Sequence, residues 1–204
     1  MSLMTAYIKP DCIHVFADGA FYDTETGILM RVENKICPLP GLNAVFSSRG
    51  SSPAFAGFYA AVAAFSFEAF DDLTNALPEV WAVFDALMGD VGCEIMIAGW
   101  SESRARGEVY ARATHAYSKW GGMSETGATY RWVEGGVSFG VDGRDWPEGD
   151  PTEDNCAPMV AAIEKARSIQ YDLHCGEQDT ENMGYAIGGH IQHVVLGSHV
   201  MGTE

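Results

Sequence analysis

His14-Val-Phe-Ala-Asp-Gly-Ala20 is the first of three stretches that decide how this chain folds; the others are Arg31-Val-Glu-Asn-Lys-Ile-Cys37 and Asn43-Ala-Val-Phe-Ser-Ser-Arg-Gly50. β-Branched and aromatic residues dominate these stretches, which predicts three short strands. Asp18 ends one of these strands and Lys35 begins another. The first quarter of the chain therefore combines strands with one acid and one lysine in prominent positions.

Further strands are predicted on both sides of these stretches. Residues 5–8 and 12–17 flank the Pro10-Asp11 turn and form a hairpin-like pair, and residues 28–32, 35–37 and 42–48 are separated by turn residues. Strand patterns return at residues 94–100, 107–113, 130–133, 136–139 and 190–196.

Helices are predicted between these strand blocks. Ser52 is placed as an N-cap and Pro53 at the first helical position, where its missing N–H costs nothing. This helix should run to about Phe65, and because it is apolar on every side it must be covered on more than one face. A second helix is expected from residues 70–71 to 88, bent or split by Pro78, and a third over residues 156–169.

The strands arrive in adjacent pairs between helical blocks, which favours two antiparallel sheets over a parallel βαβ sheet. We therefore predict an α+β fold in the form of a four-layer αββα sandwich. A length of 204 residues, of which 47% are apolar, fits one domain with a sizeable core.

Charge and hydropathy exclude some partners. The formal net charge of −16 repels phosphate backbones, so we expect no nucleic acid partner. No run of eighteen uncharged apolar residues and no secretory signal occur, so we expect no membrane partner and a cytoplasmic location. The cysteines are widely spread and predict neither a disulfide framework nor a zinc site; they are Cys12, Cys37, Cys93, Cys156 and Cys175.

The start of the chain reads as a cloning leader. Met1-Ser-Leu is followed at once by a second methionine, Met4, so residues 1–4 are set aside as leader and initiator. The expected domain is then residues 5–204. Thr5 is small enough for Met4 to be removed, which would leave Thr5 with a free α-amine.

This beginning resembles that of proteasome β-subunits and the related bacterial ATP-dependent protease core, which are N-terminal-nucleophile (Ntn) hydrolases. The matching residues are Ala17-Asp18-Gly19, Lys35 and the strand–Gly–helix passage over residues 44–56, within a resemblance that covers residues 5–113. The resemblance implies Thr5 as nucleophile and base, supported by Asp18 and Lys35. It also implies a peptide or amide substrate, no cofactor and a homo-oligomer.

Physical chemistry is consistent with that constellation. A hydroxyl needs an adjacent base to become nucleophilic, and a nearby ammonium lowers the cost of an alkoxide. Two alternatives remain open. One is a noncatalytic assembly or scaffold subunit of the same architecture, which needs neither a processed Thr5 nor a pocket containing Lys35. The other is an unrelated α+β binding module.

Clustered imidazoles near the C-terminus raise the question of a metal. His190 and His193 are three residues apart, with His199 beyond them. Positions three apart on a strand face opposite sides, so this pair should not converge, and we predict no metal site.

Overall fold

The computed structural model describes residues 3–23, 26–114, 127–139, 156–168, 171–172, 183–184 and 187–198. Within these ranges the chain forms helices and antiparallel sheets, an α+β architecture as predicted. The strands are β1 (Met4–Ile8), β2 (Cys12–Asp18), β3 (Ala20–Tyr22), β4 (Leu29–Val32), β5 (Cys37–Pro38), β6 (Ala44–Gly50), β7 (Cys93–Ser101), β8 (Arg106–Ala113), β9 (Thr129–Trp132), β10 (Gly135–Phe139), β11 (Tyr171–Asp172), β12 (Met183–Gly184) and β13 (Ile191–Gly197). The helices are α1 (Pro53–Ala63), α2 (Phe70–Asn75), α3 (Leu77–Met88) and α4 (Ala157–Arg167).

Two antiparallel sheets carry the fold. The four-stranded sheet has the order β10-β1-β2-β13, and the five-stranded sheet has the order β5-β6-β7-β8-β9. The predicted hairpin is present: β1 pairs with β2, with Met4 opposite Ala17. Strand β13, from the far end of the chain, pairs with β2 on its other edge. This pairing brings the C-terminal strand beside Asp18.

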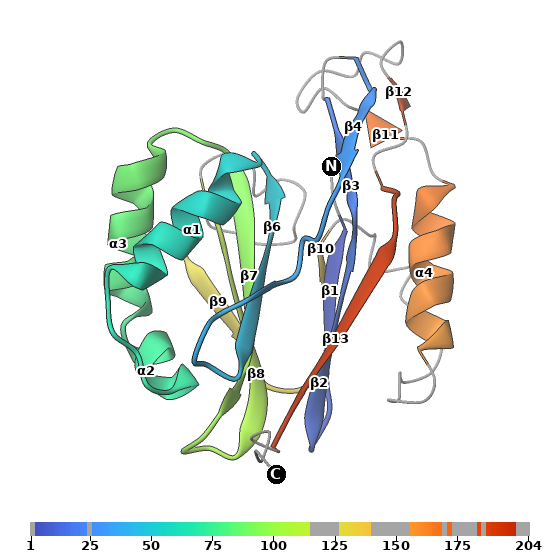
Figure 1. The fold of residues 1–204 in the computed structure, drawn as a ribbon. Coiled ribbons are helices and arrows are strands. Elements are labelled where there is room, and N and C mark those ends of the chain that lie inside the picture. The colour runs from blue at the N-terminus through green and yellow to red at the C-terminus, as the bar shows by residue number, and fades with distance from the viewer. Residues whose placement is uncertain are drawn as a thin grey trace.

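Three cores separate the layers seen in Figure 1. One lies between the two sheets and includes Val15, Val45 and Met96. A second lies between the five-stranded sheet and helices α1 to α3, and a third between the four-stranded sheet and α4. Alternate residues of each central strand point to opposite faces, so β2 sends Val15 to the first core and Phe16 to the third.

The helices follow the sequence pattern with local differences. Helix α1 begins at Pro53 as expected and contacts both β6 and α3, which explains its apolar residues on every side. Ser52 has helical backbone angles and its side chain makes no capping hydrogen bond, unlike the predicted N-cap. The second predicted helix is split: α2 and α3 are separated at Ala76, two residues before Pro78.

Leu3 and Met4, which the sequence analysis assigned to the leader and initiator, are among the described residues. Leu3 is packed against α4 and Met4 lies in the core between the sheets, both of them buried. Their burial makes them part of the folded domain. Residues 1 and 2 of the predicted leader lie outside the described ranges.

The described helices include none that is both long and apolar enough to cross a membrane.

Candidate functional site

Asp18 and Lys35 form a buried ion pair at the end of β2. Lys35 Nζ lies 3.0 Å from Asp18 Oδ1, and the two side chains are 1% and 0% exposed. Lys35 precedes β5 by two residues and comes to the pair along the segment that follows β4. The structure thus brings together two of the three residues predicted for the site.

The Asp18 carboxylate also accepts three backbone N–H groups. Oδ1 accepts from Leu3 N at 2.8 Å, while Oδ2 accepts from Gly188 N at 3.1 Å and Ala20 N at 3.3 Å. Hydrogen bonds of this kind offset part of the desolvation cost of a buried carboxylate. Asp18 therefore joins the start of β1, the start of β3 and the segment before β13.

Lys35 is held by several groups besides Asp18. Its ammonium donates to the carbonyl of Ala20 and lies 4.7 Å from the centre of the Phe21 ring. Burial lowers the pKa of Lys35, while the charge and the hydrogen bond of Asp18 oppose that shift. The backbone N–H groups of Lys35 and Ile36 both donate to the Gln192 side chain of β13.

Thr5 lies inside β1. It is paired with Phe16 of β2 on one side and with Ser138 of β10 on the other. Its side chain is buried, and no described residue forms a hydrogen bond with Oγ1. Leu3, two residues earlier, is the residue whose amide reaches the Asp18 carboxylate.

The chemistry available at this site depends on whether Thr5 has a free α-amine. A buried ammonium beside a strand terminus can support a hydroxyl nucleophile only if that hydroxyl carries or adjoins a base. Thr5 is bonded to Met4 and its nitrogen belongs to a peptide bond within the strand. As the chain stands, Thr5 has no free amine to act as its base.

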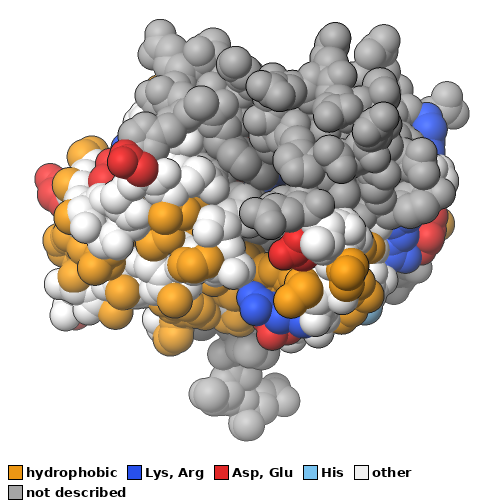
Figure 2. All heavy atoms as spheres, turned by 90° about the horizontal axis from the view of Figure 1, so that it is seen from above, with side chains coloured by type: hydrophobic (Ala, Val, Ile, Leu, Met, Phe, Trp, Pro, Cys, Tyr) orange, Lys and Arg blue, Asp and Glu red, His pale blue; other side chains and the backbone are white. Residues whose placement is uncertain are grey.

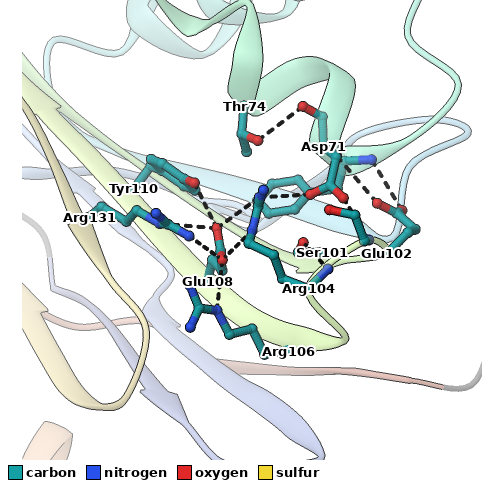
Figure 3. A network of polar contacts seen from close by, with 11 residues as sticks. Asp71, Thr74, Ser101, Glu102, Arg104, Arg106, Glu108, Tyr110 and Arg131 are labelled. Carbon is teal, nitrogen blue, oxygen red and sulfur yellow. Dashed lines mark hydrogen bonds and ion pairs between the residues drawn. The ribbon is translucent and has the colours of Figure 1, made fainter.

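A second charged cluster lies on the five-stranded sheet, on the side of helix α2 (Figure 3). Glu108 is fully buried and accepts hydrogen bonds from Arg104 Nε at 2.7 Å, Arg106 Nε at 3.0 Å and Tyr110 Oη at 2.7 Å, and from Arg131 as well. Burial alone would raise the pKa of Glu108, but these hydrogen bonds outweigh it and lower the pKa to about 2.

The same cluster links α2 to the β7–β8 turn through an ion pair and hydrogen bonds. Arg104 Nη2 lies 2.7 Å from Asp71 Oδ1, and Glu102 accepts the backbone N–H groups of Phe70 and Asp71. The side chains come from α2, β8, β9 and the turn between β7 and β8 (Figure 3). The network accounts for the position of α2.

A third buried pair joins β6 and β7. Arg49 and Glu94 are opposite each other in the ladder, Arg49 Nε lies 3.0 Å from Glu94 Oε2, and the side chains are 1% and 0% exposed. Sequence reasoning missed this pair and the Glu108 cluster, because both depend on strand register.

Within the described ranges, the histidines near the C-terminus do not form a metal site. His190 is exposed and forms a hydrogen bond with Asn34. His193 lies on β13 and contacts His14, and His199 lies outside the described residues. Across the described ranges, no three His, Cys, Asp or Glu side chains are grouped so that they could hold a metal ion.

Comparison with known proteins supports the fold through structure. No family model matches the chain, and no curated protein matches its sequence. Solved structures match over nearly its whole length. Anbu (ancestral beta-subunit) from Yersinia bercovieri matches with a TM-score of 0.62 and 8% identity, over 96% of this chain and 81% of that one.

Two further structures agree. An Anbu (Gly-1) mutant from Hyphomicrobium sp. strain MC1 gives a TM-score of 0.65 at 9% identity, over 97% of this chain and 88% of that one. The eukaryotic HslV from Trypanosoma brucei gives a TM-score of 0.54 at 12% identity, over 96% of this chain and 99% of that one. The chain has a proteasome-like fold. At these identities the likeness concerns the fold, and the site has to be argued from this chain's own residues.

Proposed function

We propose that the protein is a noncatalytic subunit with the four-layer αββα arrangement of Ntn proteins, and that it assembles with copies of itself. Its proteasome-like fold supports the architecture, and Anbu, one of its structural neighbours, is described as an ancestral beta-subunit. The site argues for the absence of catalysis.

The position of Thr5 is the observation that carries this proposal. An Ntn nucleophile acts through its own α-amine or a neighbouring base, so it must stand at a free chain end. Thr5 instead has strand partners on both sides and two buried residues, Leu3 and Met4, before it. Cutting the chain at Thr5 would remove apolar side chains from two cores.

In this proposal Asp18 and Lys35 act structurally. The pair connects three backbone segments that are far apart in the sequence, through Leu3, Ala20 and Gly188. A buried charge pair with good geometry and further hydrogen bonds can be maintained for such a role. The pair therefore joins the end of β2 to the residue before β1, to the start of β3 and to the segment before β13.

One observation favours a second function, hydrolysis of an amide or peptide bond. The buried Lys35 ammonium and the Asp18 carboxylate lie where the chain enters β1, since Asp18 binds the amide of Leu3. Under this alternative Thr5 is the nucleophile and base after processing, and Asp18 and Lys35 are its electrostatic support. It requires removal of Leu3 and Met4.

A covalent probe separates the two functions. The purified chain is incubated with a peptide epoxyketone, which captures an N-terminal hydroxyl nucleophile, and the intact mass is measured before and after. The variant Thr5→Ala tests the predicted nucleophile. Ser2→Ala tests the residue that precedes Leu3 in the sequence and lies outside the described ranges.

The noncatalytic proposal expects no adduct on the native protein, so that each of the three chains keeps the same mass before and after incubation. An adduct that is lost in Thr5→Ala would establish hydrolase chemistry at Thr5. An adduct that is lost only in Ser2→Ala would also refute the proposal and place the nucleophile one residue before Leu3. A heat-unfolded sample controls for nonspecific labelling.

A further inference from the structure

Four side chains form a hydrogen-bonded row on the outer face of the four-stranded sheet, which we call the Cys–His row: Cys12, His14, His193 and Cys156. Cys12 Sγ lies 3.4 Å from His14 Nε2, and His14 Nδ1 lies 3.0 Å from His193 Nε2. His193 Nδ1 lies 3.2 Å from Cys156 Sγ. The row is separate from the Asp18–Lys35 pair and has no role in the function proposed above.

Sheet register and helix packing explain why these residues meet. Cys12, His14 and Phe16 alternate along β2 and so share one face. Strand β13 pairs with β2 so that His193 is opposite Phe16, and the two rings stack with centroids 4.2 Å apart. Cys156 directly precedes α4, which packs on the same face through its own buried side chains.

The arrangement follows the logic of a nucleophile, a base and a residue that orients the base. If His193 Nδ1 accepts the thiol proton, His193 Nε2–H donates to His14 Nδ1, and His14 Nε2–H then donates to Cys12. One proton per imidazole satisfies every contact in the row. Burial lowers the pKa of both histidines, which keeps them neutral and able to accept a proton near pH 7.

Cys156 is suited to the position of the nucleophile. Its side chain is half-buried, so it can be reached from solvent, whereas Cys12 at the other end of the row is buried. It also lies at the start of an 11-residue helix, where the helix dipole favours a thiolate. Burial raises the pKa of the Cys156 thiol, so the thiol is protonated at rest and needs a base.

We propose that Cys156 is a reactive thiol, with His193 as its general base and His14 as the residue that positions His193, and that its co-reactants are low-molecular-weight disulfides. The Cys156 proton moves to His193 Nδ1 as the sulfur attacks one sulfur of the disulfide. A new S–S bond forms and the old one breaks. Cys156 is oxidised, the leaving sulfur is reduced, and the leaving thiolate takes the proton from His193.

Other cysteines of the chain serve as internal controls. Cys37 is half-buried like Cys156, and the part of the chain that the structure describes offers its thiol no imidazole. Cys93 is buried, and burial raises its pKa to about 11. If exposure alone set reactivity, Cys37 and Cys156 would react alike.

The test follows modification of the full-length native protein by oxidised glutathione, with peptide mapping to give a rate for each cysteine. We expect Cys156 to react at least about 10-fold faster than Cys37, and Cys156→Ser to abolish that adduct. General-base assistance is worth about 10²-fold or more, so His193→Gln should slow Cys156 by about that factor while leaving Cys37 unchanged. Equal rates for Cys37 and Cys156, or an unchanged rate in His193→Gln, overturns the proposal.

The role of His14 is tested through the pH dependence of the Cys156 rate. Lys9 and Asp11, in the turn before β2, act on the pKa of His14 with opposite signs and are unchanged in the variants. We expect His14→Gln to shift the midpoint of the pH–rate profile, whereas a purely structural residue would change the melting temperature without moving the midpoint. If His193→Gln fails to fold, the wild-type profile decides: a midpoint for Cys156 no lower than for Cys37 overturns the proposal.

Discussion

The buried Lys35–Asp18 pair holds several backbone segments together. Removing both charges from water is costly, and their mutual attraction repays that cost only when further hydrogen bonds complete the geometry. Asp18 supplies this completion through the amides of Leu3, Ala20 and Gly188. Removal of one partner would leave the other as an uncompensated buried charge.

Lys35→Met should therefore lower the free energy of unfolding by about 3–5 kcal/mol, the cost of breaking a buried pair from one side. Arg31→Met is the matched control, because Arg31 pairs with Glu33 at the surface, where such pairs contribute about 0–1 kcal/mol. Urea unfolding of the three chains measures both values. A loss for Lys35→Met no larger than for Arg31→Met would contradict the structural role.

Thr5→Val tests the environment of the predicted nucleophile. The hydroxyl of Thr5 is buried without a hydrogen-bond partner among the described residues, so replacing it with a methyl group of similar shape should be neutral or should stabilise the protein by up to about 1 kcal/mol. Thr5→Ala, which also removes the buried methyl, should destabilise it by about 1 kcal/mol. The same unfolding experiment applies, and a loss above about 1 kcal/mol for Thr5→Val would indicate a missing partner.

Sequence reasoning identified the Asp18–Lys35 pair but not the residues around it. The resemblance to proteasome β-subunits, carried by Ala17-Asp18-Gly19 and Lys35, implied these two residues. The expectation that Lys35 begins a strand was wrong, since Lys35 lies two residues before β5. Gly188 and Gln192 approach the pair only because β13 pairs with β2 in one particular register. The Cys–His row was missed for the same reason, since His193 and Cys156 lie far from Cys12 in the sequence.

Helix α2 shows that a short element can depend on its tertiary contacts for stability. It is only six residues long, too short to be stable alone, and it depends on the β7–β8 turn and on packing against β7. Phe70 at its first position packs against Gly99, where an added Cβ atom would come within 2.4 Å of the ring. Gly99 is needed for this close approach.

Gly99→Ala should destabilise the protein by about 1–3 kcal/mol, as expected for overpacking of a buried contact. The second variant Gly99→Ala/Phe70→Leu removes the ring from that contact and should lose less than the sum of its two single changes. A thermal unfolding series of the four chains gives the coupling. Additive losses would mean that Gly99 and Phe70 act independently.

The Glu108 cluster should make this region sensitive to acid. The pKa of Glu108 is lowered from 4.5 to about 2 in the folded protein, so the stability it contributes is complete above about pH 4.5 and is lost as the pH falls towards 2. The stability difference between wild type and Glu108→Gln should accordingly shrink between pH 5 and pH 2.5 in urea unfolding. A difference that stays constant over this range would rule out the lowered pKa.

Most strands and helices could be predicted because their patterns are local. Pro53 sets the start of α1, and the split before Pro78 follows from its missing N–H and fixed φ angle. Short strands such as β3 and β5 are defined by pairing rather than by their own two or three residues. The burial of Leu3 and Met4 was missed because it depends on α4 and on the opposite sheet.

At the scale of the whole molecule, charge and apolar surface act against each other. A net charge of −16 makes copies of the chain repel at low salt. Apolar residues nevertheless reach the surface, as Figure 2 shows for the face seen from above. Among the described residues, four large apolar side chains that are neighbours in the sequence are exposed along β4 and just before it. We call them the β4 patch: Ile28, Leu29, Met30 and Val32, between 45% and 65% exposed.

Met30 and Val32 alternate along β4 and so share one face. Exposed apolar side chains gathered on one face are typical of an interface, and a second copy of the chain is the partner that the assembly proposal requires. Met30→Asp places a charge in the β4 patch and should dissociate the assembly. Leu87→Asp, at an equally apolar and exposed position on α3, is the matched control and should leave the assembly intact.

The most direct test of the account is the mass of the native particle, measured by light scattering at moderate salt for these three chains. The account predicts one discrete oligomer for the wild type and for Leu87→Asp, and a monomer for Met30→Asp. A wild-type protein that remains a 22.0 kDa monomer would contradict it.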